Sequence, residues 1–204
     1  DLRRTLLRRI AETLSGPLGD VDGAIAAWRT LLDDFGPDKS VLAALAALYE
    51  KSGAHRDLEE TLGKQLDLAE EPNDRVAFLA RLGRLRIENL DSLHEGLEAY
   101  RDALTIDASH AVTRDALEKL LGNEAARAEA AALLRPLYET ENANEKLLGV
   151  LQIQAAANDD PLEKLEVLAT AVEVAERGLN DAKRAFELAA RGLELAAAGD
   201  SVRA

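Results

Sequence analysis

An internal repeat limits what this chain can fold into more than any other feature of its sequence. A shift of 89 residues, called the long shift below, places two long stretches on top of each other without a gap. The identical pairs related by the long shift include Tyr49 and Tyr138, Leu58 and Leu147, Leu62 and Leu151, Gln65 and Gln154, Pro72 and Pro161, and Leu90 and Leu179. Because self-similarity at a fixed offset is typical of stacked structural units, the chain is predicted to be an array of related pieces.

These pieces are predicted to be helices. Apolar residues recur three and four positions apart through almost the whole chain, as on the buried face of an amphipathic helix. The segments with this spacing are residues 2–14, 21–34, 39–52, 56–69, 73–89, 92–106, 109–121, 124–140, 144–157, 161–177 and 182–197. Asp20 and Asp160 stand where N-caps are expected, just before the second and tenth segments. The connections are short, so about eleven helices are expected to pack antiparallel in an all-α fold.

The composition disfavours several classes of function. A net charge of −13 and a pI near 4.7 disfavour binding to nucleic acid or to anionic lipid. The chain has no Cys, which excludes disulfides, thiolate catalysis and Cys-ligated zinc. No apolar run approaches the about 20 residues that a membrane-spanning helix needs, and no signal peptide opens the chain. A cytoplasmic location is therefore the default expectation, and the absence of Met predicts a processed chain or a fragment of a longer protein.

Equivalent positions in alternate helices recur with a period of about 34 residues, enough for a pair of helices. Trp28 and Leu62 are separated by this period, and so are Tyr100 and Leu134. Small and apolar residues accompany it at Ala24, Trp28, Leu31 and Leu32, and again at Gly96, Tyr100, Ala103 and Leu104. In these positions the chain resembles a tetratricopeptide-repeat (TPR) protein. The resemblance implies one degenerate TPR-like α-solenoid over residues 1–204, with Trp28 and Tyr100 in the core and close helix packing at the small residues.

The repeat is not uniform along the chain. A second offset, of 72 residues and called the short shift below, carries Leu18 onto Leu90, Trp28 onto Tyr100 and Leu45 onto Leu117. The long shift exceeds the short shift by 17 residues, which is the length of one helix with its connection. Either a helix has been inserted near residues 108–123, or the array changes register there.

No catalytic, cofactor or metal-binding motif stands out from the helical pattern. The three histidines, His55, His94 and His110, lack the converging third and fourth ligands that a metal site requires. Carboxylate pairs such as Glu59 and Glu60 are adjacent in sequence and point apart on a helix. The chain is therefore predicted to be a non-enzymatic protein that binds no cofactor or metal.

The resemblance also implies where a partner would bind. In TPR proteins the first helix of each pair lines a concave surface. The matching positions here are Arg8, Ala43, Ala47, Ala80 and Arg84, and Arg81 stands next to Ala80. The Lys and Asn of the carboxylate clamp found in some family members are absent, because Ala43 and Ala47 occupy those positions.

A groove floored by alanines and edged by arginines is predicted to accept an acidic or C-terminal segment of a protein partner. The alternative is that these are ordinary solvated charges. The chain would then be a structural segment of a longer array, or a regulatory domain attached to a catalytic region elsewhere. The oligomeric state is not predicted.

Overall fold

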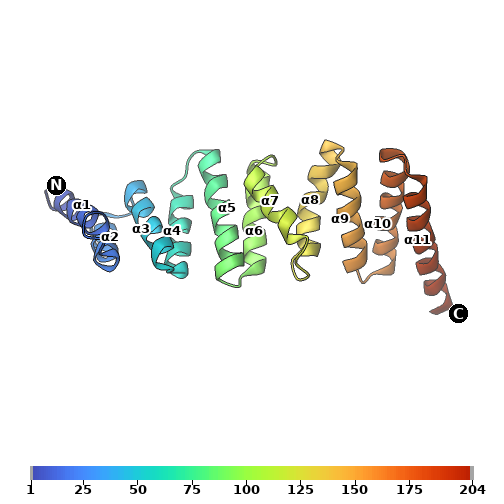
Figure 1. Ribbon diagram of the computed structural model, residues 1–204, viewed down its shortest axis with the longest axis horizontal. Coiled ribbons are helices and arrows are strands. Elements are labelled where there is room, and N and C mark those ends of the chain that lie inside the picture. Colours follow the sequence, from blue (N-terminus) through green and yellow to red (C-terminus); the bar gives the residue numbers. More distant parts are fainter. Residues whose placement is uncertain (1, 203–204) are drawn as a thin grey trace. The chain divides into compact units, whose positions relative to one another are not determined.

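The computed structural model describes residues 2–202, which divide into two compact units with the boundary between His110 and Ala111. Within these residues the chain forms eleven α-helices, one π-helical turn and no strand (Figure 1). The helices of the first unit are α1 (Leu2–Ser15), α2 (Val21–Phe35), α3 (Lys39–Ser52), α4 (His55–Asp67), α5 (Pro72–Asn89) and α6 (Leu93–Ile106). Those of the second are α7 (Ala111–Leu120), α8 (Arg127–Glu141), α9 (Asn144–Ala157), α10 (Pro161–Glu173) and α11 (Ala182–Val202). The predicted all-α fold is confirmed.

Several helix ends differ from the sequence prediction by one or two residues, and three differ by more. The eleventh helix runs to Val202 instead of residue 197. The tenth helix was expected to run to residue 177, but its α-helical part ends at Glu173 and the chain continues as the π-helical turn Val174–Gly178. The eighth helix begins at Arg127 instead of residue 124. There the side-chain oxygen of Asn123 accepts a hydrogen bond from the Ala125 N–H, 3.0 Å away, which holds these residues in a turn before the helix starts.

Acidic N-caps begin several helices as predicted. The side chain of Asp20 accepts a hydrogen bond from the backbone N–H of Gly23 at 2.9 Å. The side chain of Asp160 accepts one from Leu162 at 2.8 Å, and Pro161 occupies the first turn of α10. Each cap satisfies one of the backbone donors that a helix start leaves without a partner.

The turns between paired helices show the internal repeat in three dimensions. The turns α1–α2, α5–α6 and α10–α11 each contain a residue with positive φ, at Gly19 (66°), Asp91 (53°) and Asn180 (53°). In each turn the next residue donates its N–H to the carbonyl six positions earlier: Asp20 to Leu14 (2.8 Å), Ser92 to Arg86 (2.9 Å) and Asp181 to Ala175 (2.9 Å). The short shift relates the first turn to the second, and the long shift relates the second to the third. The three pairs are therefore the same structural hairpin.

A second type of turn recurs at the long shift. Gly53 between α3 and α4 and Asn142 between α8 and α9 both adopt the left-handed conformation, with φ of 71° and 53°. The N–H that follows bonds to a tyrosine carbonyl in both places, Ala54 to Tyr49 at 3.0 Å and Ala143 to Tyr138 at 2.9 Å. The run α3–α6 is therefore repeated as α8–α11, and α7 lies between the two runs. The insertion of a helix in this region stays a prediction.

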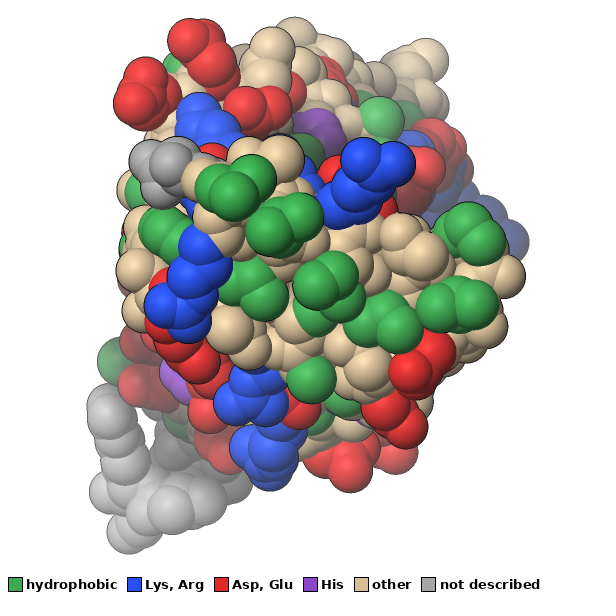
Figure 2. Space-filling model, turned by 90° about the vertical axis from the view of Figure 1, so that its left-hand side faces the viewer, with side chains coloured by type: hydrophobic (Ala, Val, Ile, Leu, Met, Phe, Trp, Pro, Cys, Tyr) green, Lys and Arg blue, Asp and Glu red, His purple; other side chains and the backbone are tan. Residues whose placement is uncertain are grey.

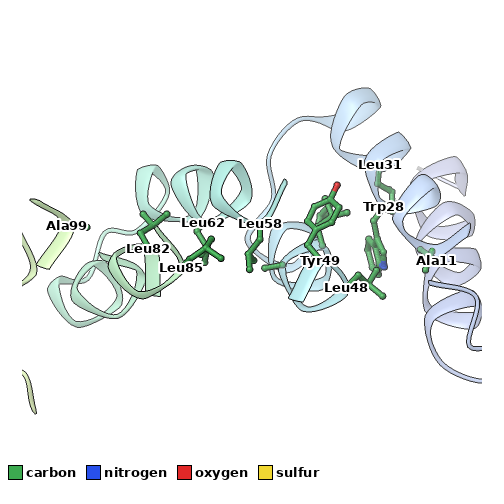
Figure 3. Packing of buried hydrophobic residues seen from close by; sticks show 14 residues of the cluster. Ala11, Trp28, Leu31, Leu48, Tyr49, Leu58, Leu62, Leu82, Leu85 and Ala99 are labelled. Carbon is green, nitrogen blue, oxygen red and sulfur yellow. The ribbon is translucent and has the colours of Figure 1, made fainter. Parts of the chain in front are cut away.

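The main core cluster of the first unit is a file of buried side chains that runs through its helices (Figure 3), and Val76, Leu79 and Ala103 form a second, smaller cluster. Leu31 of α2, Leu45 of α3 and Leu62 of α4 are each 1% exposed. The two predicted aromatic anchors, Trp28 and Tyr100, are 5% and 3% exposed, which confirms their place in the core. Each helix packs mainly on its neighbours in sequence, as the short connections predicted.

The helices α5 and α6 approach each other closely at two glycines. A methyl group added to Gly83 would lie 2.5 Å from the Tyr100 ring, and one added to Gly96 would lie 2.9 Å from the Gly83 carbonyl oxygen. Neither side has room for a side chain, so glycine is required at both positions. The predicted close packing at Gly96 is confirmed, and Ala24 and Ala103 are likewise fully buried.

The second unit has a core of the same kind. Leu134 of α8, Tyr138 of α8 and Leu151 of α9 are 0%, 1% and 0% exposed. They occupy the positions of Leu45, Tyr49 and Leu62 in the first unit.

Truncation of equivalent core leucines is expected to destabilise each unit. Leu62→Ala and Leu151→Ala each remove a fully buried side chain and should lower the free energy of unfolding by about 2–5 kcal/mol. Leu162→Ala is the control, because Leu162 is 65% exposed and its loss should change stability by less than about 0.5 kcal/mol. Urea denaturation followed by circular dichroism measures all three. Equal midpoints for the buried and exposed variants would contradict the assignment of the core.

Glycine is expected to stabilise the left-handed turns. Asn142→Gly and Asn180→Gly should each raise the free energy of unfolding by about 0.5–1 kcal/mol, because a side chain is unfavourable at positive φ. Asn158→Gly should have the opposite sign, since Asn158 has a φ of −82° and its side chain accepts the Asp160 N–H at 2.9 Å. Thermal denaturation of the three variants provides the comparison. A loss of stability in both left-handed variants would show that the asparagine side chains hold these turns.

Candidate peptide-binding trough

The residues of the predicted groove lie in different environments. Ala43 and Ala47 are exposed on α3, and Arg84 is exposed on α5. Ala80 is only 6% exposed, so it offers a partner less surface than Ala43 and Ala47. It lies one residue before half-buried Arg81, on the side of α5 that packs into the unit.

Two hollows lie between α3, α4 and α5, within the first unit. The smaller has a volume of about 160 Å³, and its lining is Lys39, Ala43, Gln65, Ala69, Asp74 and Phe78. The larger has a volume of about 200 Å³, and its lining is Glu50, His55, Leu58, Leu62, Arg81, Arg84, Leu85, Glu88 and Asn89. Because the same three helices line both, we refer to the pair as the α3–α5 trough. The trough contains three of the predicted residues, Ala43, Arg81 and Arg84.

Each hollow of the trough is lined by one α4 residue with a buried polar atom that has no hydrogen-bond partner among the described residues. The smaller hollow is lined by Gln65, which is only 8% exposed and whose Oε1 is this atom. The larger hollow is lined by half-buried His55, whose Nδ1 is this atom. Both residues belong to α4. Buried polar atoms are rarely left unpaired in native proteins, because each costs about 1–3 kcal/mol, so these two require an explanation.

The charges of the trough are mixed. Arg81 Nη2 lies 2.7 Å from Glu50 Oε1, and this ion pair joins α5 to α3. Arg84 forms no ion pair with a described residue, although Glu88 lines the same hollow. The cationic character that the sequence predicted for this face is therefore reduced, and Arg84 is the arginine of the trough that is left without a carboxylate partner among the described residues.

Arg8 lines neither hollow of the trough. Its Nη2 donates to Ser40 Oγ at 2.8 Å and lies 3.6 Å from Asp38 Oδ1. The hydrogen bond from the Ser40 hydroxyl, together with the backbone N–H groups of α3 and the nearby Arg8, holds the pKa of Asp38 below its usual value. Arg8 therefore links α1 to the start of α3, which the sequence did not indicate.

The second unit has a related but different hollow. Its volume is about 380 Å³, and its lining is Ala128, Arg135, Gln154, Ala157, Asn158, Asp159 and Val167. Gln154, the equivalent of Gln65, accepts a hydrogen bond from Arg135 Nη1 at 3.4 Å, so its oxygen has a partner. The long shift places Thr170 and Glu173 at the positions of Arg81 and Arg84. The unpaired acceptor and the two arginines therefore belong to the first unit.

Sequence reasoning missed Gln65, His55 and Phe78 as parts of the site. Gln65 was visible as one of the residues repeated at the long shift, and a polar residue within a buried stripe was the available signal. His55 was placed at a helix start, where it lies, but its buried ring nitrogen depends on α5 and could not be read from the sequence.

No group of three or more His, Asp or Glu side chains within residues 2–197 could hold a metal ion. No helix of this part of the chain is long and apolar enough to cross a membrane.

Comparison with known proteins gives structural similarity only. No family model and no curated protein matches the chain. The crystal structure of MamA protein is 18% identical with a TM-score of 0.44, and the alignment covers 95% of this chain and 91% of that one. The TPR2AB domain of yeast Sti1, in complex with pHSP90, is 19% identical with a TM-score of 0.44, covering 93% and 82%. BtubC (BKLC) from P. vanneervenii is 17% identical with a TM-score of 0.32, covering 97% and 91%.

The hairpins of this chain are TPR-like in fold. Their pairs of antiparallel helices follow one another in sequence, and the small residues Ala24, Gly96 and Ala103 are buried as the resemblance predicted.

The unpaired acceptor predicts an unusual effect of mutation. Gln65→Leu should raise the free energy of unfolding by about 1 kcal/mol, because it removes a buried acceptor that has no partner. Gln154→Leu is the matched control and should lower stability or leave it unchanged, since its oxygen accepts from Arg135. Urea midpoints of the two variants give the answer. A larger loss from Gln65→Leu than from Gln154→Leu would show that Gln65 is already satisfied in the free protein.

Proposed function

We propose that this chain is a non-enzymatic protein-interaction module, and that its α3–α5 trough binds an extended segment of a partner protein. The two hollows, each lined by one α4 residue whose polar atom has no hydrogen-bond partner among the described residues, are the observation that supports this most. A partner's backbone has an N–H and a C=O at almost every residue, so it can supply hydrogen bonds to both side chains once they turn toward the hollows.

The spacing of the two atoms suits a short extended segment. His55 and Gln65 are ten residues apart on α4, a distance of about 15 Å at the helical rise of about 1.5 Å per residue. An extended chain advances about 3.3 Å per residue, so about five residues of a partner would reach from one hollow to the other. A helix of five residues would cover only half that distance.

The lining suggests what side chains the segment carries. The smaller hollow offers the ring of Phe78 and the methyl group of Ala43, which favour a small apolar side chain. The larger hollow offers Arg84 without an ion-pair partner among the described residues, which favours an acidic side chain or a terminal carboxylate. Since exposed ion pairs contribute little, the affinity is expected to be micromolar or weaker and to fall with added salt.

Binding in the trough can be tested with a displayed library of random heptapeptides, selected against the whole chain. Enriched peptides are then measured by calorimetry at low salt against the wild type, Arg84→Glu, and the double variant Arg81→Glu with Arg84→Glu. The double variant should bind about tenfold more weakly, which corresponds to about 1.4 kcal/mol. Arg177→Glu is the matched control, because Arg177 is exposed and stands in the second unit at the position of Glu88.

If the enriched peptides bind the folded double variant as tightly as the wild type at low salt, the partner surface lies outside the trough. A selection that enriches no peptide would favour the structural alternative predicted from the sequence.

A further inference from the structure

A third hollow of the first unit lies on the other face of α4 and has no part in the trough. Its volume is about 310 Å³, larger than that of either hollow of the trough. Its lining, at the ends of α2 and α4 and in the connection to α3, is Leu32, Asp33, Pro37, Lys64, Asp67 and Leu68. At about 3.6 residues per turn, Lys64 and Asp67 face away from the trough residues Leu62 and Gln65. We refer to this surface as the α2–α4 hollow.

The two carboxylates of the α2–α4 hollow are without a partner in the described part of the chain. Asp33 and Asp67 are both exposed, and neither forms an ion pair or a side-chain hydrogen bond with a described residue. The neighbouring Asp34 differs, because Arg3 pairs with it. The hollow therefore presents two carboxylates that a ligand can use.

The positions of these two carboxylates are unfavourable in the free protein. Asp33 stands in the last turn of α2, and Asp67 is the last residue of α4. The C-terminal end of a helix carries a partial negative charge, which repels a carboxylate. The internal repeat does not require them, because the long shift places Gly122 and Ala156 at the same positions. Two unfavourable carboxylates in one hollow indicate a cationic ligand.

The cations near the hollow do not neutralise it. Lys64 belongs to the lining, but its Nζ donates to Glu60 Oε1 at 2.7 Å, one turn further back on α4. This hydrogen bond lowers the pKa of Glu60, and the charge of nearby Arg29 lowers it further. Together with Asp33 and Asp67, three carboxylates stand against two cations, and the ends of the two helices add further negative charge. The hollow therefore favours a cation.

The rest of the lining is apolar. Leu32 and Leu68 are half-buried, and Pro37 is exposed beside them. A matching ligand has an apolar stem and a cationic head, which is the form of a Lys or Arg side chain. Two carboxylates favour arginine, because its planar guanidinium has five N–H donors and is less strongly hydrated than an ammonium group.

The α1 side of the same unit is different. Figure 2 shows hydrophobic side chains in the middle of that side, with Lys and Arg side chains among the Asp and Glu side chains around them. Opposite charges are already paired there, as Arg3 is with Asp34. In the α2–α4 hollow the apolar lining stands beside carboxylates that are left for a ligand.

We propose that the α2–α4 hollow binds an arginine side chain of a partner protein. The stem would lie against Leu32, Pro37 and Leu68, and the guanidinium would donate to Asp33 and Asp67. The site shares no residue with the trough and does not depend on the function proposed for it. Since exposed charge pairs contribute little each, one such side chain alone should bind in the millimolar range.

The test is an NMR titration of the whole isotope-labelled chain with three small probes. They are N-acetyl-arginine amide, the citrulline analogue, which keeps the shape without the charge, and the lysine analogue. The arginine probe should shift the amide signals of residues 31–37 and 64–69, and added salt should weaken it. The citrulline probe should leave these signals in place, and the lysine probe should bind more weakly than arginine.

Two double variants locate the site. Asp33→Asn with Asp67→Asn should weaken the arginine probe by about fivefold or more. Glu95→Gln with Asp102→Asn is the matched control, because both residues are exposed on α6 and the variant removes the same charge from the same unit. It should bind the probe like the wild type. The hollow variant should also unfold at a higher temperature than the wild type, because two unfavourable carboxylates are gone.

Four results would overturn the proposal. The first is an arginine probe that leaves the signals around the hollow unchanged. The second is a citrulline probe that shifts them equally, which would mean that the charge is not recognised. The third is tighter binding of the lysine probe, which would mean that the site prefers an ammonium group. The fourth is equal weakening in the two double variants, which would mean that the net charge of the chain attracts the probe.

Discussion

The left-handed residue that follows the first helix of each hairpin is the constraint on which the rest of this fold depends. At Gly19, Asp91 and Asn180 the chain leaves a helix through positive φ, and the next N–H returns to a carbonyl six residues back. This bond sets the residue at which the helix stops and the direction in which the next one starts. Because the same turn occurs at the same register three times, the leucines of successive helices meet in the same way each time.

That regularity accounts for what could be predicted from the sequence and what could not. Helix periodicity and short connections were enough to place eleven helices and the buried aromatic residues Trp28 and Tyr100. Side-chain partners were not predictable, because they depend on residues far apart in sequence. Arg81 reaches Glu50, 31 positions away, and Arg8 reaches Ser40, 32 positions away. Nor could the periodicity tell how much surface each small side chain keeps. Ala80 is predicted to floor the groove together with Ala43 and Ala47, and α5 leaves it only 6% exposed.

The two units share the same arrangement of helices, but different side chains line their equivalent hollows. Gln65 and Gln154 occupy the same position, but only the second has a hydrogen-bond donor within reach, from Arg135. Arg81 and Arg84 of the first unit are replaced by Thr170 and Glu173 in the second. A repeat protein can change such positions without loss of fold, because they lie outside the buried leucine file. The proposed binding site therefore belongs to the first unit alone, and the second unit supplies the natural comparison.

The central claim of this account is that each unit is held by contacts between neighbouring helices, so that damage stays local. Native-state hydrogen exchange, read by mass spectrometry, tests it most directly when the two equivalent leucine variants are compared with the wild type. With Leu62 truncated to alanine, exchange should accelerate in α3, α4 and α5, while α8, α9 and α10 keep the wild-type rates. The variant at Leu151 should give the reverse pattern. Equal acceleration of both regions in either variant would contradict the account, because it would mean that the whole chain unfolds as one cooperative body.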